Sequence, residues 1–149
     1  MKKKSCWLLV ALMVIFIFSN SAASAGTSNG MSLTVSEWVR PGLNTVGLHP
    51  ETDFLNFVIR KLAHFSEYAL LGCLIAAAYR LQPWSWMKSK AALLPFFIIP
   101  VLDENLQRFS AGRSCELRDM LIDSAGMAVG MFLAIVLLGI IGHQKKQED

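Results

Sequence analysis

The sequence has few charged residues and lacks the features of a soluble enzyme or a nucleic-acid-binding protein. Only 17% of its 149 residues are charged, against about 25% in an ordinary soluble domain. The net charge is a mild +3, without a basic stripe that would indicate nucleic acid. The cysteines, Cys6, Cys73 and Cys115, are odd in number and far apart, which predicts free thiols and argues against zinc or redox spacing. A Ser or Cys nucleophile signature is also missing.

What the chain has instead is apolar sequence. Hydrophobic residues make up 54% of it, and the mean hydropathy is +0.45. Long apolar runs predict an all-α integral membrane protein, a small polytopic bundle of four transmembrane helices, or of three if the N-terminal segment is cleaved. The expected spans cover residues 6–23, 62–81, 86–106 and 120–142.

Residues 1–25 fit two interpretations. A basic start at Lys2–Lys4, an apolar run and the small residues Ala23-Ser24-Ala25 are typical of a cleavable signal peptide. The same pattern fits a retained first transmembrane helix. In both cases the basic start stays in the cytoplasm and residues 26–149 form the main membrane domain. We therefore expect a multi-pass protein whose N-terminus and C-terminus are both cytoplasmic.

Residues 26–61 are expected to form an outer segment. Met31, Val35, Trp38 and Val39 are apolar among Ser, Thr and Glu, up to Pro41. This spacing predicts a short interfacial helix lying on the outer leaflet. An ordinary loop with a few anchoring aromatics fits the composition equally well.

Ionisable residues stand at the ends of the expected spans, and all fall at the outer end. Such a group costs roughly 2.5–3.5 kcal/mol at the centre of a span and less near the interface. A chain that accepts this cost repeatedly is expected to gather the groups into one polar site. The residues concerned are His64, Glu67, Asp103, Glu104, Asp119 and Asp123.

Helical spacing places the polar side chains on shared faces. In the second span, spacings of four, three and four residues form one stripe. That stripe consists of Arg60, His64, Glu67 and Leu71. In the third span Asp103 and Gln107 are also four residues apart.

The last span carries carboxylates and glycines on one stripe. Gly126 and Gly130 form a G-x-x-x-G, which allows close helix approach, so Asp119 and Asp123 should point into the bundle. These two carboxylates are four residues apart and repel each other. The expected compensation is a bound cation, protonation of one carboxyl group, or an arginine. The arginines considered are Arg60, Arg113 and Arg118.

These residues also carry a family resemblance. The segments Arg60-Lys61-Leu-Ala-His64-Phe65-Ser-Glu67-Tyr68, Asp103-Glu104-Asn-Leu-Gln107-Arg-Phe109, Gly112-Arg113-Ser114 and Asp119-x-x-x-Asp123-Ser-x-Gly126-x-x-x-Gly130 occur in this order. Together they resemble the VanZ-like family over residues 57–132. The resemblance implies a small bacterial plasma-membrane protein of four helices with a retained first span. The founding member is associated with resistance to the glycopeptide teicoplanin, and no reaction is implied. Position 123 departs from the commonest pattern, since it is often Asn in the family.

Three hypotheses of function remain open. The first is an outer-face site that binds or modifies an envelope component, such as a membrane lipid headgroup, a lipid-linked precursor or an amphiphilic antibiotic. Arginine among carboxylates suits an anionic group. The expected ligand-binding residues are Arg60, Lys61, His64, Glu67, Gln107, Arg113, Arg118, Asp119 and Asp123.

The second hypothesis is an intramembrane enzyme that acts on a lipid-linked substrate. His64 and Glu67 would serve as base and orienting group, and the catalytic candidates are His64, Glu67, Asp103 and Glu104. A divalent cation could be held through carboxylate oxygens. The metal candidates are Asp103, Glu104, Asp119 and Asp123. The third hypothesis is structural: the charges form a salt-bridge network that fixes the helices.

Overall fold

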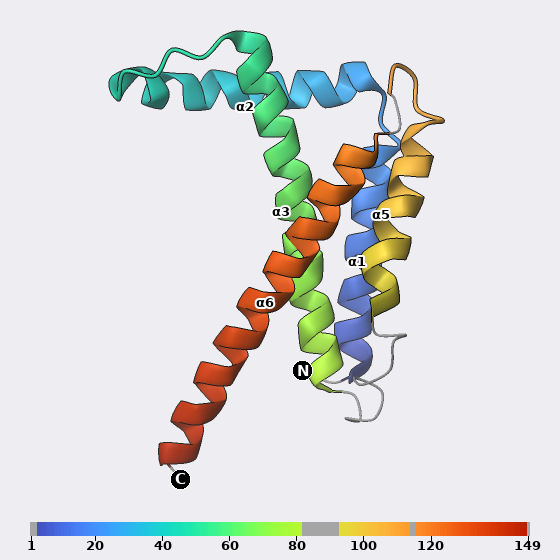
Figure 1. Ribbon diagram of the computed structural model, residues 1–149, viewed down its shortest axis with the longest axis vertical. Coiled ribbons are helices and arrows are strands. Elements are labelled where there is room, and N and C mark those ends of the chain that lie inside the picture. The colour runs from blue at the N-terminus through green and yellow to red at the C-terminus, as the bar shows by residue number, and fades with distance from the viewer. Residues whose placement is uncertain (1–2, 82–92, 114–115, 149) are drawn as a thin grey trace.

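The computed structural model describes residues 3–81, 93–113 and 116–148, and this part of the chain is helical, as predicted (Figure 1). The positions of Trp84, Trp86 and Cys115 lie outside the described residues. Cys6 and Cys73 are free thiols, as expected. The helices are α1 (Lys3–Ser21), α2 (Ala25–Thr45), α3 (Thr52–Arg80), α5 (Leu94–Gln107) and α6 (Leu117–Glu148).

Three of the described helices are long and apolar enough to cross a membrane. They comprise Lys4–Ser21, Thr52–Arg80 and Leu117–Ile140, and they correspond to the spans predicted at 6–23, 62–81 and 120–142. α5 covers the second half of the span predicted at 86–106, whose first residues, 86–92, lie outside the described residues. The chain is thus a helical multi-pass membrane protein.

α3 begins ten residues before the predicted span, and this corrects the expected extent of the outer segment. The segment was expected to reach residue 61, but helix starts at Thr52. No Gly or Pro interrupts residues 52–61, and charged side chains such as Arg60 and Lys61 are compatible with helix. The change from polar to apolar sequence at residue 62 marks the start of the apolar span. The helix itself begins earlier, at Thr52.

α2 lies crosswise at one end of the bundle formed by α1, α3, α5 and the inclined α6 (Figure 1). A helix over these residues is therefore confirmed over the loop alternative, although it is longer than expected, with 21 residues and Pro41 inside it. Its start is capped by Ser24, whose Oγ accepts a hydrogen bond from the Thr27 N–H at 3.2 Å.

α2 buries polar side chains and exposes apolar ones, the opposite of a helix on the surface of a soluble protein. Its buried face consists of Ser28, Ser32 and Ser36. The hydroxyl of Ser36 donates to the Ser32 carbonyl at 2.8 Å and that of Ser32 to the Ser28 carbonyl at 3.1 Å, so both hydroxyls are satisfied within the helix. Its exposed apolar side chains include Trp38, which is 79% exposed. The remaining members of this exposed set are Met31, Val35 and Val39.

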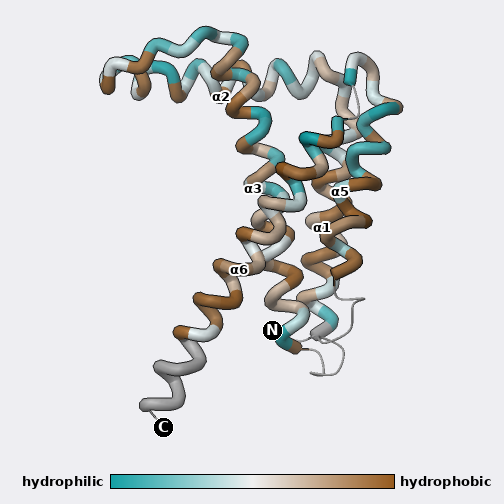
Figure 2. The backbone as a smooth tube through the Cα atoms, viewed as in Figure 1, coloured by the Kyte–Doolittle hydropathy of each residue, from teal (hydrophilic) through white to brown (hydrophobic). Residues whose placement is uncertain are grey.

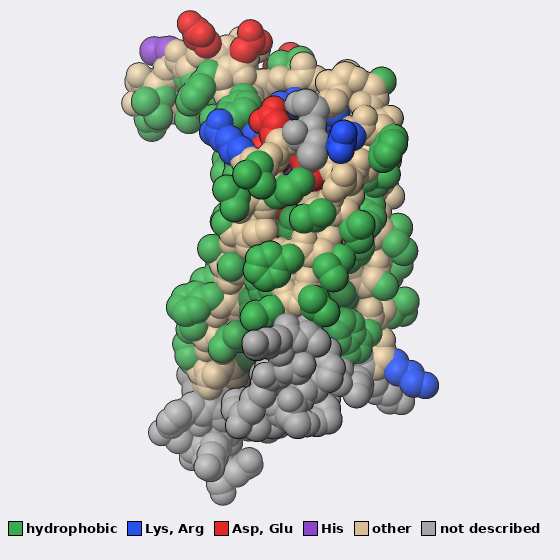
Figure 3. Space-filling model, turned by 45° about the vertical axis from the view of Figure 1, so that its right-hand side comes forward, with side chains coloured by type: hydrophobic (Ala, Val, Ile, Leu, Met, Phe, Trp, Pro, Cys, Tyr) green, Lys and Arg blue, Asp and Glu red, His purple; other side chains and the backbone are tan. Residues whose placement is uncertain are grey.

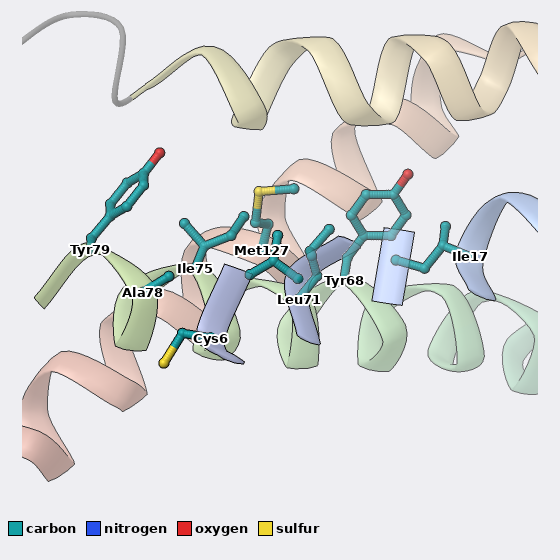
Figure 4. Packing of buried hydrophobic residues seen from close by; sticks show 9 residues of the cluster. Cys6, Ile17, Tyr68, Leu71, Ile75, Ala78, Tyr79 and Met127 are labelled. Carbon is teal, nitrogen blue, oxygen red and sulfur yellow. The ribbon is translucent and has the colours of Figure 1, made fainter. Parts of the chain in front are cut away.

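The core joins α1, α3 and α6 (Figure 4). Ile17 of α1, Tyr68 and Leu71 of α3, and Met127 of α6 are all 0% exposed. α1 also contributes Cys6 and Val10 to this cluster. The first apolar segment therefore packs as an integral helix of the bundle.

Glycines let α3 and α6 make the most extensive helix contact of the structure. A Cβ on Gly126 would stand 2.5 Å from the Phe65 carbonyl oxygen. One on Gly130 would collide with the Ala69 backbone, and one on Gly72 with the Met127 backbone. The predicted packing role of Gly126 and Gly130 is confirmed, and it brings the first turns of α6 against α3.

Polar residues concentrate at the end of the bundle next to α2. Figure 2 shows hydrophilic sequence in the turns of α3, α5 and α6 nearest α2, and hydrophobic sequence along most of their remaining lengths. Figure 3 shows acidic and basic side chains gathered just below the α2 arm. Both chain ends lie toward the opposite end of the bundle (Figure 1).

Candidate functional site

Three helices bring ionisable side chains together beneath α2. Potential ligand atoms of His64 on α3, Asp103 on α5 and Asp123 on α6 all lie within 4.8 Å of one another. Lys61 on α3 contacts Asp119 on α6. The predicted convergence of the distant segments is therefore confirmed for these residues.

Lys61 relieves part of the repulsion between the α6 carboxylates. Its Nζ donates hydrogen bonds to both carboxylate oxygens of Asp119, and the two side chains are 14% and 20% exposed. The sequence left open an arginine, a bound cation or protonation as the compensation for this pair, and the structure places a lysine, Lys61, against Asp119. Lys61 follows Arg60 in the sequence, so it lies about 100° further round α3 than the stripe. This rotation directs Lys61 toward α6.

Glu67 is tied to the first helix. Its Oε1 accepts a hydrogen bond from the Asn20 side-chain amide at 2.8 Å. Glu67 and His64 share the face of α3 that the sequence predicted. This contact links α1 and α3 at the level of the polar site.

Asp103 and Glu104 are both 0% exposed. The side chains of Ser21, Tyr68 and Gln107 lie around the Asp103 carboxylate. Oε1 of Glu104 accepts a hydrogen bond from the Glu116 backbone N–H at 2.5 Å. Glu104 therefore fixes the start of α6 against the end of α5.

Asp123, like Asp103, is a buried carboxylate that accepts no hydrogen bond from the described residues. Asp123 is 1% exposed. The His64 Nδ1 stands 4.0 Å from its Oδ1. Such a group is costly to bury without a partner.

The connection from α5 to α6 places Arg113 over this cluster. Gly112 has a φ of +76°, a left-handed conformation that glycine adopts without a Cβ penalty. The Arg113 Nη1 donates to the Ser21 carbonyl at 3.4 Å, and the Ser110 hydroxyl donates to the same oxygen at 3.0 Å. The end of α1 therefore anchors the connection.

Arg113 stands near a second cation. Burial, and then the positive charge of Arg60, lower the pKa of Arg113 from its ordinary value, while the nearby carboxylates act in the opposite direction. A guanidinium remains charged at neutral pH. Two neighbouring arginines in a half-buried site favour an anion between them.

Two hollows meet at these arginines. The first has a volume of about 110 Å³ and is mainly polar. Its lining includes Phe57, Arg60, Lys61, His64, Gln107, Arg113 and Asp119. The second has a volume of about 350 Å³, lies between α1, α2 and α3, and is mainly apolar. Arg60, His64 and Arg113 line both.

Most of the sequence-predicted ligand residues line these hollows. Arg60, Lys61, His64, Gln107, Arg113 and Asp119 line the first, and Glu67 lines the second. Asp123 lies buried against His64 instead. Arg118 is exposed, lines neither hollow, and has its Cζ 5.4 Å from the centroid of the Phe57 ring.

Sequence reasoning missed Asn20 and Ser21 as part of the site. Both are polar residues at the outer end of the first apolar run. Ser21 is 0% exposed and accepts contacts from the α5–α6 connection. Their position after an apolar run was the available signal, but nothing in it says which helices α1 contacts.

One of three comparisons with known proteins found a match. The family model described as VanZ/LLP1 matches residues 6–138. The match includes nearly all of α1 and the whole polar site. No match was found among curated proteins or solved structures. The chain, by its match over most of its length, belongs to the VanZ/LLP1 family.

Proposed function

We propose that the paired hollows bind an anionic, membrane-resident amphiphile of the cell envelope, such as a phospholipid or a lipid-linked precursor. One observation carries the proposal: the small polar hollow and the larger apolar one share Arg60, His64 and Arg113. An amphiphile has the same two-part character, with a charged headgroup joined to an apolar chain.

The polar hollow suits a headgroup. Its volume of about 110 Å³ is well below the 300–1,000 Å³ of typical drug-sized ligand sites, so it accommodates a small group such as a phosphate. Arg60 and Arg113 supply forked N–H donors that match phosphate oxygens. An anion between them also relieves their mutual repulsion.

The second hollow suits an acyl or isoprenoid chain. Its walls include Phe16 of α1, Met31 and Val35 of α2, and Ile59 and Ala63 of α3. Trp38 and Val39 of α2, which are exposed and line neither hollow, would rest in the outer leaflet. In this arrangement the ligand enters from the lipid, beneath α2, and the polar site faces the outside.

The same arrangement accounts for the proposed topology and biology. Both chain ends lie toward the opposite end of the bundle from the site (Figure 1), which supports cytoplasmic termini and an outward-facing site. Holding or altering an envelope component at the outer face of a bacterial plasma membrane could change susceptibility to a glycopeptide such as teicoplanin.

The test is equilibrium binding by the purified full chain in detergent. Phosphatidylglycerol, phosphatidylcholine and undecaprenyl pyrophosphate are titrated separately. The two anionic probes should bind and the zwitterionic one should bind more weakly. Arg113→Ala should weaken anionic binding about tenfold or more, because a charge-assisted hydrogen bond is lost.

Arg118→Ala is the matched control. It removes one arginine of the same outer face that lines neither hollow, so affinity should stay within about twofold. The proposal is wrong if both variants bind as the wild type does, or if both lose affinity equally. In the first case the arginines do not bind the anion, and in the second the effect is one of general surface charge.

A further inference from the structure

We infer that His64, Asp103 and Asp123 form a binding site for a divalent transition-metal cation, such as Mn²⁺ or Zn²⁺, beside the polar hollow that His64 lines. Each residue comes from a different helix, α3, α5 or α6, and each offers one ligand atom. The inference concerns the cation alone and does not depend on lipid binding.

The three ligand atoms are close to the spacing that a cation requires. They lie within 4.8 Å of one another, and His64 Nδ1 and Asp123 Oδ1 are 4.0 Å apart. Metal bonds of about 2.0–2.2 Å place adjacent ligand atoms roughly 3 Å apart and opposite ones a little over 4 Å apart. Small side-chain rotations would bring the three atoms into this range.

Burial makes the arrangement hard to explain without a cation or a proton. Asp103 is 0% and Asp123 is 1% exposed. Within the described residues, the Asp123 oxygens and the His64 Nδ1 have no hydrogen-bond partner. Buried carboxylates are normally paired, hydrogen-bonded or bound to a metal.

The positive groups near this pair of carboxylates have other partners. Asp103, Asp119 and Glu104 place negative charge near Asp123, and Lys61 places positive charge there. The His64 ring lies 4.0 Å from Asp123, and Arg113, whose charge acts on Asp103, donates to the Ser21 carbonyl. Lys61 is already paired with Asp119. A divalent cation between Asp103 and Asp123 would neutralise both carboxylates at once.

The neighbours of Asp103 suit a supporting role for a metal ligand. Ser21, Tyr68 and Gln107 surround its carboxylate. Groups of this kind orient ligating carboxylates in metalloproteins. His64 also lines both hollows, so a cation held here would present an open coordination position to whatever fills them.

The ligand set differs from the one expected from the sequence, and so does the metal. Four carboxylates would favour a hard cation such as Mg²⁺ or Ca²⁺. Two of those candidates have other contacts, because Asp119 pairs with Lys61 and Glu104 accepts the Glu116 N–H. One imidazole with two carboxylates favours Mn²⁺, Fe²⁺ or Zn²⁺.

The experiment measures cation binding by the full chain in detergent after treatment with a chelator. Equilibrium dialysis against Mn²⁺ or Zn²⁺, followed by elemental analysis, should give one ion per chain. Asp123→Asn and His64→Gln keep the side-chain shape approximately and should each weaken binding by at least about tenfold. Glu51→Gln removes an exposed carboxylate elsewhere on the outer face and should leave binding unchanged.

Two further measurements keep the outcome interpretable. Thermal unfolding in the presence of chelator shows that each variant is folded, and added Mn²⁺ should raise the midpoint for the wild type but not for Asp123→Asn. In the Mn²⁺-loaded protein, electron spin echo should detect a nitrogen coupling that disappears in His64→Gln.

The inference is overturned if the folded wild type binds no stoichiometric ion, or if Asp123→Asn binds it equally well. If the wild type binds no ion but still binds the anionic lipids, the proposed function stands and this inference fails.

Discussion

His64 on α3 and Asp123 on α6 face each other with Nδ1 and Oδ1 4.0 Å apart, one helical turn from the point where Gly126 meets the Phe65 carbonyl. The polar contact and the glycine contact therefore belong to one helix interface. Close approach of the backbones at Gly126 places the two side chains within reach of each other.

Substituting Gly126 should test this dependence. Gly126→Ala places a Cβ 2.5 Å from the Phe65 carbonyl oxygen, and the helices must separate to admit it. Overpacking of this kind costs roughly 1–3 kcal/mol. We expect a lower unfolding midpoint in detergent together with weaker cation binding.

Gly139→Ala is the control for that experiment, because a Cβ there would meet nothing within 4 Å. It should leave the midpoint unchanged or raise it slightly, since Ala is the better helix former. Equal destabilisation by the two substitutions would show that loss of helix contact is not the cause.

The N-terminal helix should be retained in the mature protein. α1 contributes Ile17 and Ser21 to the buried interior, both 0% exposed. Removal of residues 1–25 would expose Leu71 to lipid and leave Glu67 without Asn20. Intact-mass measurement of the protein purified from membranes should give a mass that includes these residues.

A mass that corresponds to cleavage after Ala25 would contradict the prediction. A form that starts at residue 26 and is expressed deliberately gives the complementary control. It should unfold at a lower temperature than the full chain, because one wall of the core is missing.

The contact between Asn20 and Glu67 should contribute to stability. Glu67→Leu leaves the Asn20 amide without its acceptor and should cost about 1–3 kcal/mol. Glu67→Gln retains an oxygen acceptor and should cost less. A double-mutant cycle with Asn20→Leu should give a coupling of roughly 0.5–3 kcal/mol in thermal or denaturant unfolding.

The same variants separate structure from function. If the polar residues serve only to hold helices together, anion binding by Glu67→Gln should follow the amount of folded protein. Lost binding by a fully folded variant would exclude the purely structural hypothesis. Zero coupling in the cycle would show that the hydrogen bond contributes nothing measurable.

Helical periodicity predicted the parts of the site that lie on single helices. The stripe with His64 and Glu67, and the stripe with Asp123 and Gly126, depend only on spacings of three and four residues. Both face the bundle interior, as expected.

Contacts between helices were harder to predict. Lys61 rather than an arginine pairs with Asp119, because the rotation of α3 against α6 decides which neighbour points across. Asn20 and Ser21 belong to the site because α1 packs beside α3 and the α5–α6 connection. Neither outcome follows from local sequence, since both depend on the relative placement of separate helices.

The serine-lined inner face and apolar outer face of α2 have a quantitative consequence. In the proposed function, the amphiphile dissolves in the membrane before it reaches Arg60 beneath this helix. The saturation of the site would then follow the mole fraction of that molecule among the lipids, so that a sparingly soluble compound could saturate it while hardly detectable in the surrounding medium.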